Sequence, residues 1–164
     1  MDGIPAGFIA AMSEYTEEQR KEMIKAMTWM LEANMVYADD DYLISWMNAD
    51  YLCNYFKHLF ALAVAPTDQK EAIQNLKDMV RFMELHTIYT PAGREVLKVD
   101  GTGFHHDTHY NAYMYAYKAW CNYIYTLKGT CFQVKKDSYE RIRKAIVSMY
   151  LMAVKGANRT DYYA

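Results

Sequence analysis

The sequence predicts an all-α fold made of antiparallel helical hairpins. Three observations support this prediction. Apolar residues recur at helical spacing along most of the chain, glycine and proline are confined to the junctions between these segments, and most junctions are short. With 164 residues, 52% of them apolar and 23% charged, the chain has the size and composition of one globular domain. We therefore expect a single helical domain over residues 1–164.

The first helix is expected over residues 16–37. Thr16 is followed three residues later by Gln19, which is the spacing of a capping box, where each side chain binds the backbone N–H of the other residue. The segment then carries one apolar face at helical spacing, formed by Met23, Met27, Met30 and Leu31. This pattern is typical of an amphipathic helix that packs on a core along one side.

Two further helices are expected on either side of Pro66. Residues 42–65, which follow an acidic hinge at 38–41, have apolar side chains around most of the helix circumference, so this helix should be largely buried until Pro66 ends it. Thr67 is the expected N-cap of a helix over residues 68–86. The apolar positions of that helix are Ile73, Leu76, Val80 and Met83.

The remaining sequence divides into a loop and two helices. Residues 87–107 contain glycine and proline and have no sustained period, so a long loop is expected, and long loops in compact domains are usually functional. One helix should run from about Thr108 to Leu127. The last should start at Asp137, with Glu140 completing a capping box, and should end at Gly156.

Charge and composition argue against nucleic acid and membrane partners. The net charge is −2, the pI is about 6.2, and basic residues are interspersed among acidic ones, so no basic field would attract nucleic acid. No apolar run is long enough to cross a bilayer. The opening segment carries an acid where a signal peptide carries basic residues. A signal for export is therefore not expected in this stretch.

Residues 100–117, DGTGFHHDTHYNAYMYAY, concentrate histidine and tyrosine more densely than any other stretch. Tyrosine combines a flat apolar face with a hydrogen-bonding tip, which suits a groove that holds a sugar chain and also suits a half-buried helix face. Three interpretations are open: a metal site, a catalytic histidine and tyrosine that act on a carbohydrate, and an aromatic helix entrance without chemistry.

The spacing argues against a metal site formed by this cluster alone. His105 and His109 have the i, i+4 spacing that lets two imidazoles share a helix face. Zinc hydrolases of the His-Glu-x-x-His type need glutamate directly after the first histidine, and here that position is His106. Because the spacing also assigns no third ligand, no metal site is predicted.

In the interpretation without chemistry, Asp107 or Thr108 caps a helix and His109 is a surface residue. The aromatic residues then belong to a core-facing stripe at i, i+3 and i+4 steps, formed by Tyr110, Tyr113, Tyr117, Cys121 and Ile124. Spacing alone supports this stripe about as well as a catalytic role.

The catalytic interpretation depends on His106 and Tyr113. Seven residues separate them, so on one helix they would lie on the same face two turns apart. If His106 belongs to the preceding loop instead, its imidazole can fold back toward the Tyr113 hydroxyl. Elimination at a uronic acid needs a base at C5, an acid for the departing glycosidic oxygen and neutralisation of the carboxylate. Histidine suits the first role and tyrosine the second.

Several segments carry a family resemblance in combination: VDGTGFHHDTHYNAYMYAYKAW, LKGTCFQV and RKAIVSMYLMA, with YTEEQRKEMIKAM, NADYLCNYFKHLF and YTPAGREVLKVDGTGF upstream. Together they resemble the catalytic helical domain of the chondroitin sulfate ABC lyases, a branch of the hyaluronate and chondroitin lyase superfamily. In that branch the catalytic tyrosine follows the catalytic histidine by seven residues. The resemblance therefore places these roles on Tyr113 and His106.

The resemblance implies part of an incomplete α/α toroid, from an enzyme that cleaves chondroitin or dermatan sulfate by β-elimination and leaves a 4,5-unsaturated uronate. Tyr113 would protonate the O4 leaving group and act as base for one uronate epimer, and His106 would assist or act as base for the other. His105 would lie near the substrate carboxylate, and Asn48 would help to neutralise it. The implied partner is an acidic glycosaminoglycan. No cofactor is required, although a divalent cation could assist carboxylate neutralisation.

The family pattern also contains a catalytic arginine after the last helix and a catalytic glutamate from a β-sandwich region. Arg159 lies before the expected place of that arginine. We therefore expect the C-terminal part of a toroid, truncated before the rest of the enzyme and inactive alone, from a full-length protein that is secreted or periplasmic. Two alternatives stay open: a non-catalytic carbohydrate-binding or helical interaction domain, and a metal-dependent hydrolase.

Overall fold

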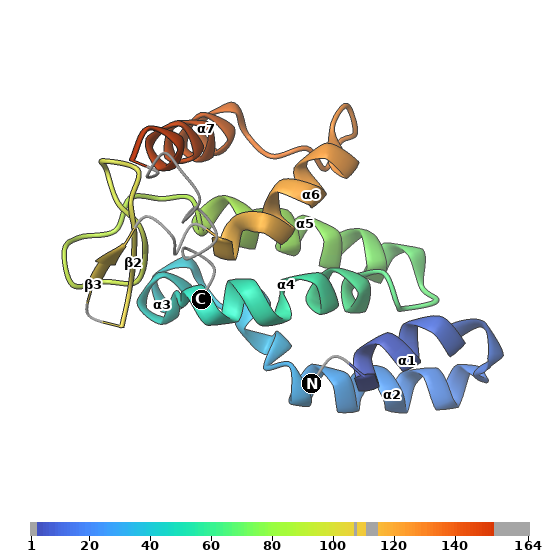
Figure 1. Cartoon of the computed structure of the whole chain (residues 1–164). Coiled ribbons are helices and arrows are strands. Elements are labelled where there is room, and N and C mark those ends of the chain that lie inside the picture. The colour runs from blue at the N-terminus through green and yellow to red at the C-terminus, as the bar shows by residue number, and fades with distance from the viewer. Residues whose placement is uncertain (1–2, 107, 111–114, 153–164) are drawn as a thin grey trace, which may run out of the picture.

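The computed structural model describes residues 3–106, 108–110 and 115–152. Helices dominate these residues, which confirms the all-α prediction (Figure 1). In chain order the elements are α1 (Gly3–Ala11), η1 (Met12–Glu14), α2 (Glu17–Met30), η2 (Ala33–Tyr37), α3 (Asp40–Trp46), α4 (Ala49–Ala63), α5 (Gln69–Leu85), β1 (Val96–Leu97), β2 (Gly103–His105), β3 (Thr108–Tyr110), α6 (Lys118–Leu127) and α7 (Lys136–Met152).

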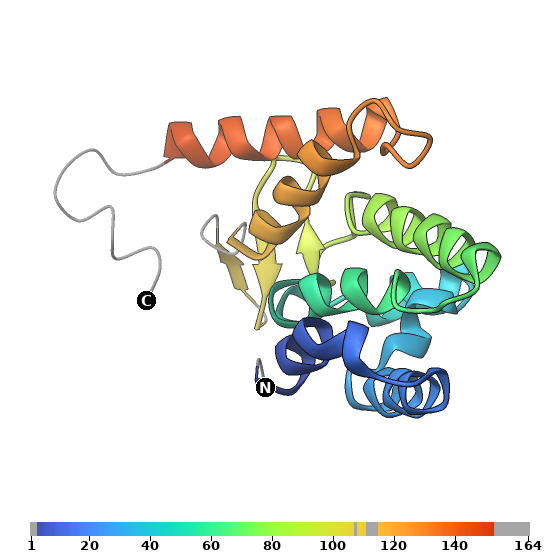
Figure 2. The same cartoon turned by 90° about the vertical axis from the view of Figure 1, so that its right-hand side faces the viewer.

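Helix α4 is central in the arrangement. It contacts α1 and α2 on one side and α5 and α6 on the other, and the pair α1 and α2 lies side by side below it (Figures 1 and 2). The three short strands lie at the end of these layers, near α3 and the start of α4 (Figure 1). Within the described residues, no helix combines the length and apolar character needed to span a bilayer.

The core lies where α4, α5 and α6 meet. Phe56, Phe82 and Trp120 are each at most 1% exposed, and the rings of Phe56 and Phe82 stack with centroids 6.1 Å apart. The one polar atom of the Trp120 side chain is satisfied, because its Nε1 donates to the Met83 carbonyl at 2.9 Å. The prediction that residues of the 42–65 segment are largely buried is confirmed for α4, where Leu52 and Phe56 are fully buried.

The first predicted helix is confirmed at its start and is shorter than predicted. The Thr16 hydroxyl accepts from the Gln19 backbone nitrogen at 3.2 Å, and Gln19 Oε1 accepts from the Thr16 backbone nitrogen at 2.9 Å. The prediction of one helix to residue 37 is wrong, because α2 ends at Met30. Glu32 then adopts a left-handed conformation with φ 51°, and the chain continues as η2.

The segment 42–65 forms two helices, not one. Asn48 leaves helical geometry with φ −146° and ψ 133°, and its Oδ1 accepts from the backbone nitrogens of Asp50 at 2.8 Å and Tyr51 at 3.2 Å. An asparagine side chain replaces the missing backbone acceptor at a helix start, so the break is stabilised locally. The apolar pattern on both sides of Asn48 hides this break.

The N-cap of α5 is Asp68, not Thr67. The Asp68 Oδ1 accepts from the backbone nitrogens of Lys70 at 2.7 Å and Glu71 at 3.4 Å. A carboxylate there satisfies two orphan N–H groups and interacts favourably with the positive end of the helix dipole. The helix body agrees with the prediction, with Met79, Phe82 and Met83 buried.

The segment 87–107 is not an unstructured loop, and no helix starts at Thr108. The strands form an antiparallel sheet in the order β1-β2-β3, with Val96 paired to Phe104 and His105 paired to Thr108. Strands of two or three residues are too short to show alternation in the sequence. Helix α6 starts only at Lys118, about ten residues later than predicted.

The connection between β1 and β2 is fixed against α7. Ser148 Oγ donates to the Asp100 carbonyl at 2.9 Å, and Lys144 Nζ donates to the Val99 carbonyl at 2.8 Å. Gly101 has φ 88°, and a Cβ on it would lie 2.5 Å from Ser148 Oγ. Only glycine fits this close approach without displacement of Ser148. The absence of a side chain at Gly101 therefore lets the β1–β2 connection pack directly on α7.

The buried Lys98 organises the rest of this segment. Its Nζ donates to Thr90 Oγ1 at 2.7 Å and to the Pro91 carbonyl at 2.8 Å, and it lies 4.9 Å from the centre of the Phe104 ring. Burial lowers the pKa of this ammonium group. These contacts close residues 90–98 into a compact turn that places Glu95 at the start of the sheet.

Helix α7 begins one residue earlier than predicted, at Lys136, so Asp137 lies inside its first turn. The predicted capping box with Glu140 is wrong, because the Glu140 carboxylate accepts from Arg143 Nε at 2.7 Å instead. The predicted C-cap, Gly156, lies outside the described residues.

Candidate active site

The imidazole of His105 is held between two carboxylates from distant parts of the sequence. His105 lies on β2 with its side chain 4% exposed. Its Nδ1 lies 2.6 Å from Glu95 Oε2, just before β1, and its Nε2 lies 3.3 Å from Asp50 Oδ2, in the first turn of α4. An ionised carboxylate only accepts, so the Nδ1–H group donates this hydrogen bond to Glu95. The ring orientation is therefore fixed.

Glu95 also connects this imidazole to the start of α4. Its Oε2 accepts from the Ala49 backbone nitrogen at 3.4 Å as well as from His105. One carboxylate thus satisfies an orphan N–H of the helix and positions the histidine. This contact holds the sheet at the end of α4 where Asn48 and Asp50 lie.

His106 is exposed beside His105, and the centroids of their rings are 3.7 Å apart. It follows β2 directly and has φ 50°, a conformation that is uncommon for residues other than glycine. Two residues separate the paired positions His105 and Thr108, and tight hairpin connections of this length favour positive φ. The chain therefore reverses direction at His106, and the His106 ring stays accessible from solvent.

The helical geometry considered for His106 and Tyr113 does not occur, because His106 follows a strand. The alternative, a loop position for His106, agrees with the structure. Tyr113 lies outside the described residues. His105 and His109 likewise do not share a helix face, since they lie on β2 and β3 and His109 is paired with Phe104.

The structure brings together three potential metal ligands, a set that the sequence spacing did not assign. Asp50, His105 and His106 each offer one ligand atom, and these atoms lie within 4.8 Å of one another. Neither Asp50 nor Glu95 was among the predicted site residues. Asp50 lies far from the histidines in the sequence, and Glu95 lies ten residues before His105 in a segment expected to be a loop. Their only signals were an acid close to Asn48 and an acid in a loop expected to be functional.

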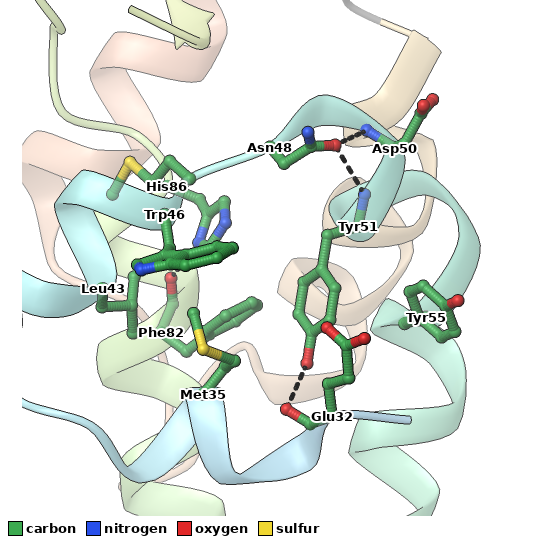
Figure 3. Close-up of a pocket in the computed structure, with 11 residues that line it drawn as sticks. Glu32, Met35, Leu43, Trp46, Asn48, Asp50, Tyr51, Tyr55, Phe82 and His86 are labelled. Atoms are coloured by element: carbon green, nitrogen blue, oxygen red, sulfur yellow. Dashed lines mark hydrogen bonds between the residues drawn. The ribbon is translucent and has the colours of Figure 1, made fainter. Parts of the chain in front are cut away.

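Asn48 caps α4 through its amide oxygen, which leaves the amide NH₂ oriented away from the helix (Figure 3). It also lines a cavity of about 260 Å³ together with Asp50, Trp46, Met35, Leu43, Met47, Glu32, Tyr51, Tyr55, Phe82 and His86 (Figure 3). Trp46 is 60% exposed at this cavity. An amide donor beside an exposed aromatic face is suited to contact with a sugar.

His86 lies buried in the wall of this cavity. Its Nδ1 donates to the Phe82 carbonyl at 2.9 Å, whereas its Nε2 has no hydrogen-bond partner among the described residues. Burial lowers the pKa of His86 to about 4, so the ring is neutral near pH 7. Its Nε2 is then an acceptor that faces away from the backbone of α5.

Two tyrosines with strongly raised pKa values have structural roles. Tyr117 is fully buried and its hydroxyl donates to the His86 carbonyl, while the Tyr51 hydroxyl donates to the carbonyls of Leu31 and Glu32 at 3.1 Å each. Burial raises the pKa of both phenols. The later half of the predicted stripe therefore faces the core, where Tyr117 is joined by the partly buried Cys121 and Ile124.

Comparison with known proteins agrees with the resemblance in the sequence. Chondroitin sulfate ABC endolyase from Proteus vulgaris is 31% identical over 97 residues, which cover 58% of this chain and 9% of that protein. The chain therefore matches only a small part of the length of this relative. The family model described as "Lyase, catalytic" matches residues 5–158. Because this match takes in most of the sequence, the chain belongs to the catalytic lyase family.

Proposed function

We propose that this chain is part of a polysaccharide lyase that cleaves chondroitin or dermatan sulfate by β-elimination at the uronic acid. The observation that carries the proposal is the exposed His106 imidazole, packed against His105 in the segment whose sequence resembles the family's catalytic segment. The name of the curated relative supports the substrate class. The whole enzyme would be secreted or periplasmic, and this chain would supply the C-terminal part of its toroid.

In the proposed reaction, the His106 imidazole accepts the C5 proton of the uronate. The electron pair left at C5 forms the C4–C5 double bond, the bond from C4 to O4 breaks, and the Tyr113 phenol donates its proton to O4. For the opposite epimer, Tyr113 would act as the base. The products are a 4,5-unsaturated uronate and a chain end with a free hydroxyl.

The carboxylate of the substrate needs positive or hydrogen-bonding partners as C5 is deprotonated. The amide NH₂ of Asn48 can donate to it, and His105 lies next to both Asp50 and His106. No cofactor is proposed as a requirement. A divalent cation bound to the substrate carboxylate would offset the negative charge of Asp50 and assist the reaction.

Replacement of Tyr113 by Phe in the full-length protein should lower turnover by about 10²–10⁴-fold, the range typical of a lost general acid or base. The assay follows the ultraviolet absorbance of the unsaturated product. Tyr125→Phe is the matched control, because this phenol is 83% exposed on α6. Equal turnover in the two variants would refute the assignment of Tyr113.

The same assay separates the alternative functions. A carbohydrate-binding domain would bind the polysaccharide without releasing unsaturated product, and His106→Ala would leave that binding intact. A metal-dependent hydrolase would release saturated product and would lose activity with a chelator.

A further inference from the structure

We propose that Asp50, His105 and His106 form a binding site for a borderline transition-metal ion, Zn²⁺ above all, and that an ion bound there inhibits the reaction. The binding is inferred from the three side chains alone. The inhibition rests on the proposed function of His106, and the two inferences are tested separately below.

The separation of the three ligand atoms fits one ion. A tetrahedral ion with nitrogen and oxygen ligands at about 2.0–2.2 Å holds those ligands about 3.3–3.6 Å apart. His105 Nε2 and Asp50 Oδ2 are already 3.3 Å apart, and all three ligand atoms lie within 4.8 Å of one another. The exposed His106 ring has space on the solvent side to adjust toward the other two ligands.

Glu95 is placed as the outer partner of a metal-binding histidine. Its carboxylate accepts from His105 Nδ1 at 2.6 Å, and this leaves Nε2 directed at Asp50. Histidine ligands in metal sites generally donate their other ring N–H to a carboxylate or carbonyl, which fixes the tautomer and increases ligand basicity. A cation between Nε2 and Asp50 would bind an electron pair from each.

Access and coordination number agree with an exchangeable ion. His105 is buried, but His106 is exposed and the Asp50 side chain is 50% exposed, so an ion can enter from solvent. Three protein ligands leave a fourth position for water or for a substrate oxygen, as in open zinc sites.

The ligand set also predicts which ions bind. Imidazole nitrogens favour Zn²⁺, Cu²⁺ and Ni²⁺, whereas Ca²⁺ and Mg²⁺ require mainly oxygen ligands. Two of the three ligands here are imidazoles. The proposed site is therefore distinct from any Ca²⁺ or Mg²⁺ that assists by contact with the substrate carboxylate.

Inhibition follows from the electron pair of His106. A ring nitrogen that is bound to a metal ion cannot accept a proton with the same electron pair. If His106 is the base for C5, Zn²⁺ and proton abstraction compete for the same atom. Fractional inhibition should then equal fractional occupancy by zinc.

The first experiment measures binding in the full-length protein by titration with Zn²⁺ against a chromophoric chelator, and by the visible absorption of bound Co²⁺. We expect saturable binding that is about 10–100-fold weaker in Glu95→Gln, the usual effect of an outer partner, and weaker still in Asp50→Asn and His106→Gln. Asp41→Asn is the matched control, since Asp41 is also an exposed acid in the first turn of a helix.

Circular dichroism establishes that each variant is folded before its affinity is compared. Absence of saturable binding in the unsubstituted protein, or equal affinities in Asp50→Asn and Asp41→Asn, would overturn the site. His106→Gln provides an independent check, because this exposed side chain contributes little to the core.

The second experiment measures elimination at graded Zn²⁺ concentrations. Inhibition that follows occupancy, is reversed by chelator and is not produced by Ca²⁺ supports both inferences. If zinc binds as expected but turnover is unchanged, the inhibition is overturned together with the role of His106 as base, while the metal site stands.

Discussion

Glu95 Oε2 lies 2.6 Å from His105 Nδ1, although the two residues belong to opposite ends of a glycine-containing turn. The same oxygen accepts from the backbone nitrogen of Ala49, 46 residues earlier. This single carboxylate thus fixes the orientation of a buried imidazole and holds it at the N-terminus of α4. The position of the candidate active site follows from this connection, because it brings the 100–106 segment to Asn48 and Asp50.

The two roles of Asn48 can be separated by substitution. Asn48→Asp should keep the stability, because aspartate caps a helix as well as asparagine does, whereas Asn48→Ala should lower the free energy of unfolding by about 1 kcal/mol. Both variants lose the amide donor, and aspartate also repels a uronate carboxylate.

Denaturant unfolding and steady-state kinetics measure the two effects. We expect the Asn48→Asp protein to show an unchanged midpoint and at least the loss of kcat/KM seen for Asn48→Ala. If Asn48→Asp retains full kcat/KM, Asn48 is a cap alone and has no contact with the substrate.

Gly101 should resist substitution more strongly than another glycine of similar backbone geometry. Gly101 has φ 88° and a new Cβ would meet Ser148, whereas Gly129 has φ 76° with nothing within 4 Å. Gly129→Ala should cost about 1–2 kcal/mol from the left-handed backbone alone. Gly101→Ala should cost about 1–3 kcal/mol more, because the Cβ also overpacks the contact with α7.

The two variants are compared by thermal and denaturant unfolding. Equal destabilisation would mean that the contact between Gly101 and Ser148 relaxes without cost. An additional loss of zinc affinity in Gly101→Ala would indicate that the contact with α7 also positions His105 and His106.

Helices α2, α5 and α7 could be predicted from the sequence because each carries a local signal, whereas α1 (Gly3–Ala11) was not predicted. The capping box at Thr16 and the apolar period of α5 each depend on residues only three or four positions apart. The break at Asn48 was missed because apolar residues continue on both sides, so the cap competes with a pattern that favours one helix.

The site could be predicted only in part, for the same physical reason. His105 and His106 were visible as an unusual local cluster, but Asp50 and Glu95 reach them through tertiary contacts. The strands that create these contacts are two or three residues long, and their pairing depends on register and on the turn at His106. No periodicity of the segment contains that information.

The burial of His86 should make the protein less stable in mild acid. Burial lowers the pKa of His86 to about 4, below the value of about 6.5 expected in the unfolded chain. Between these two pH values the unfolded state binds more protons than the folded state, so stability falls as the pH falls. Over the whole range between the two pKa values, His86 accounts for a loss of about 3 kcal/mol in the free energy of unfolding.

Comparison with His86→Gln isolates this contribution from other acid-sensitive groups. The glutamine amide can still donate to the Phe82 carbonyl, but it does not titrate. Urea unfolding at pH 7 and at pH 4.5 should therefore show a smaller loss of stability for the variant than for the unsubstituted protein, even if the variant is less stable at pH 7. Parallel losses in the two proteins would mean that His86 becomes protonated without unfolding, by admission of water or a counter-ion into the cavity beside Trp46 and Tyr51.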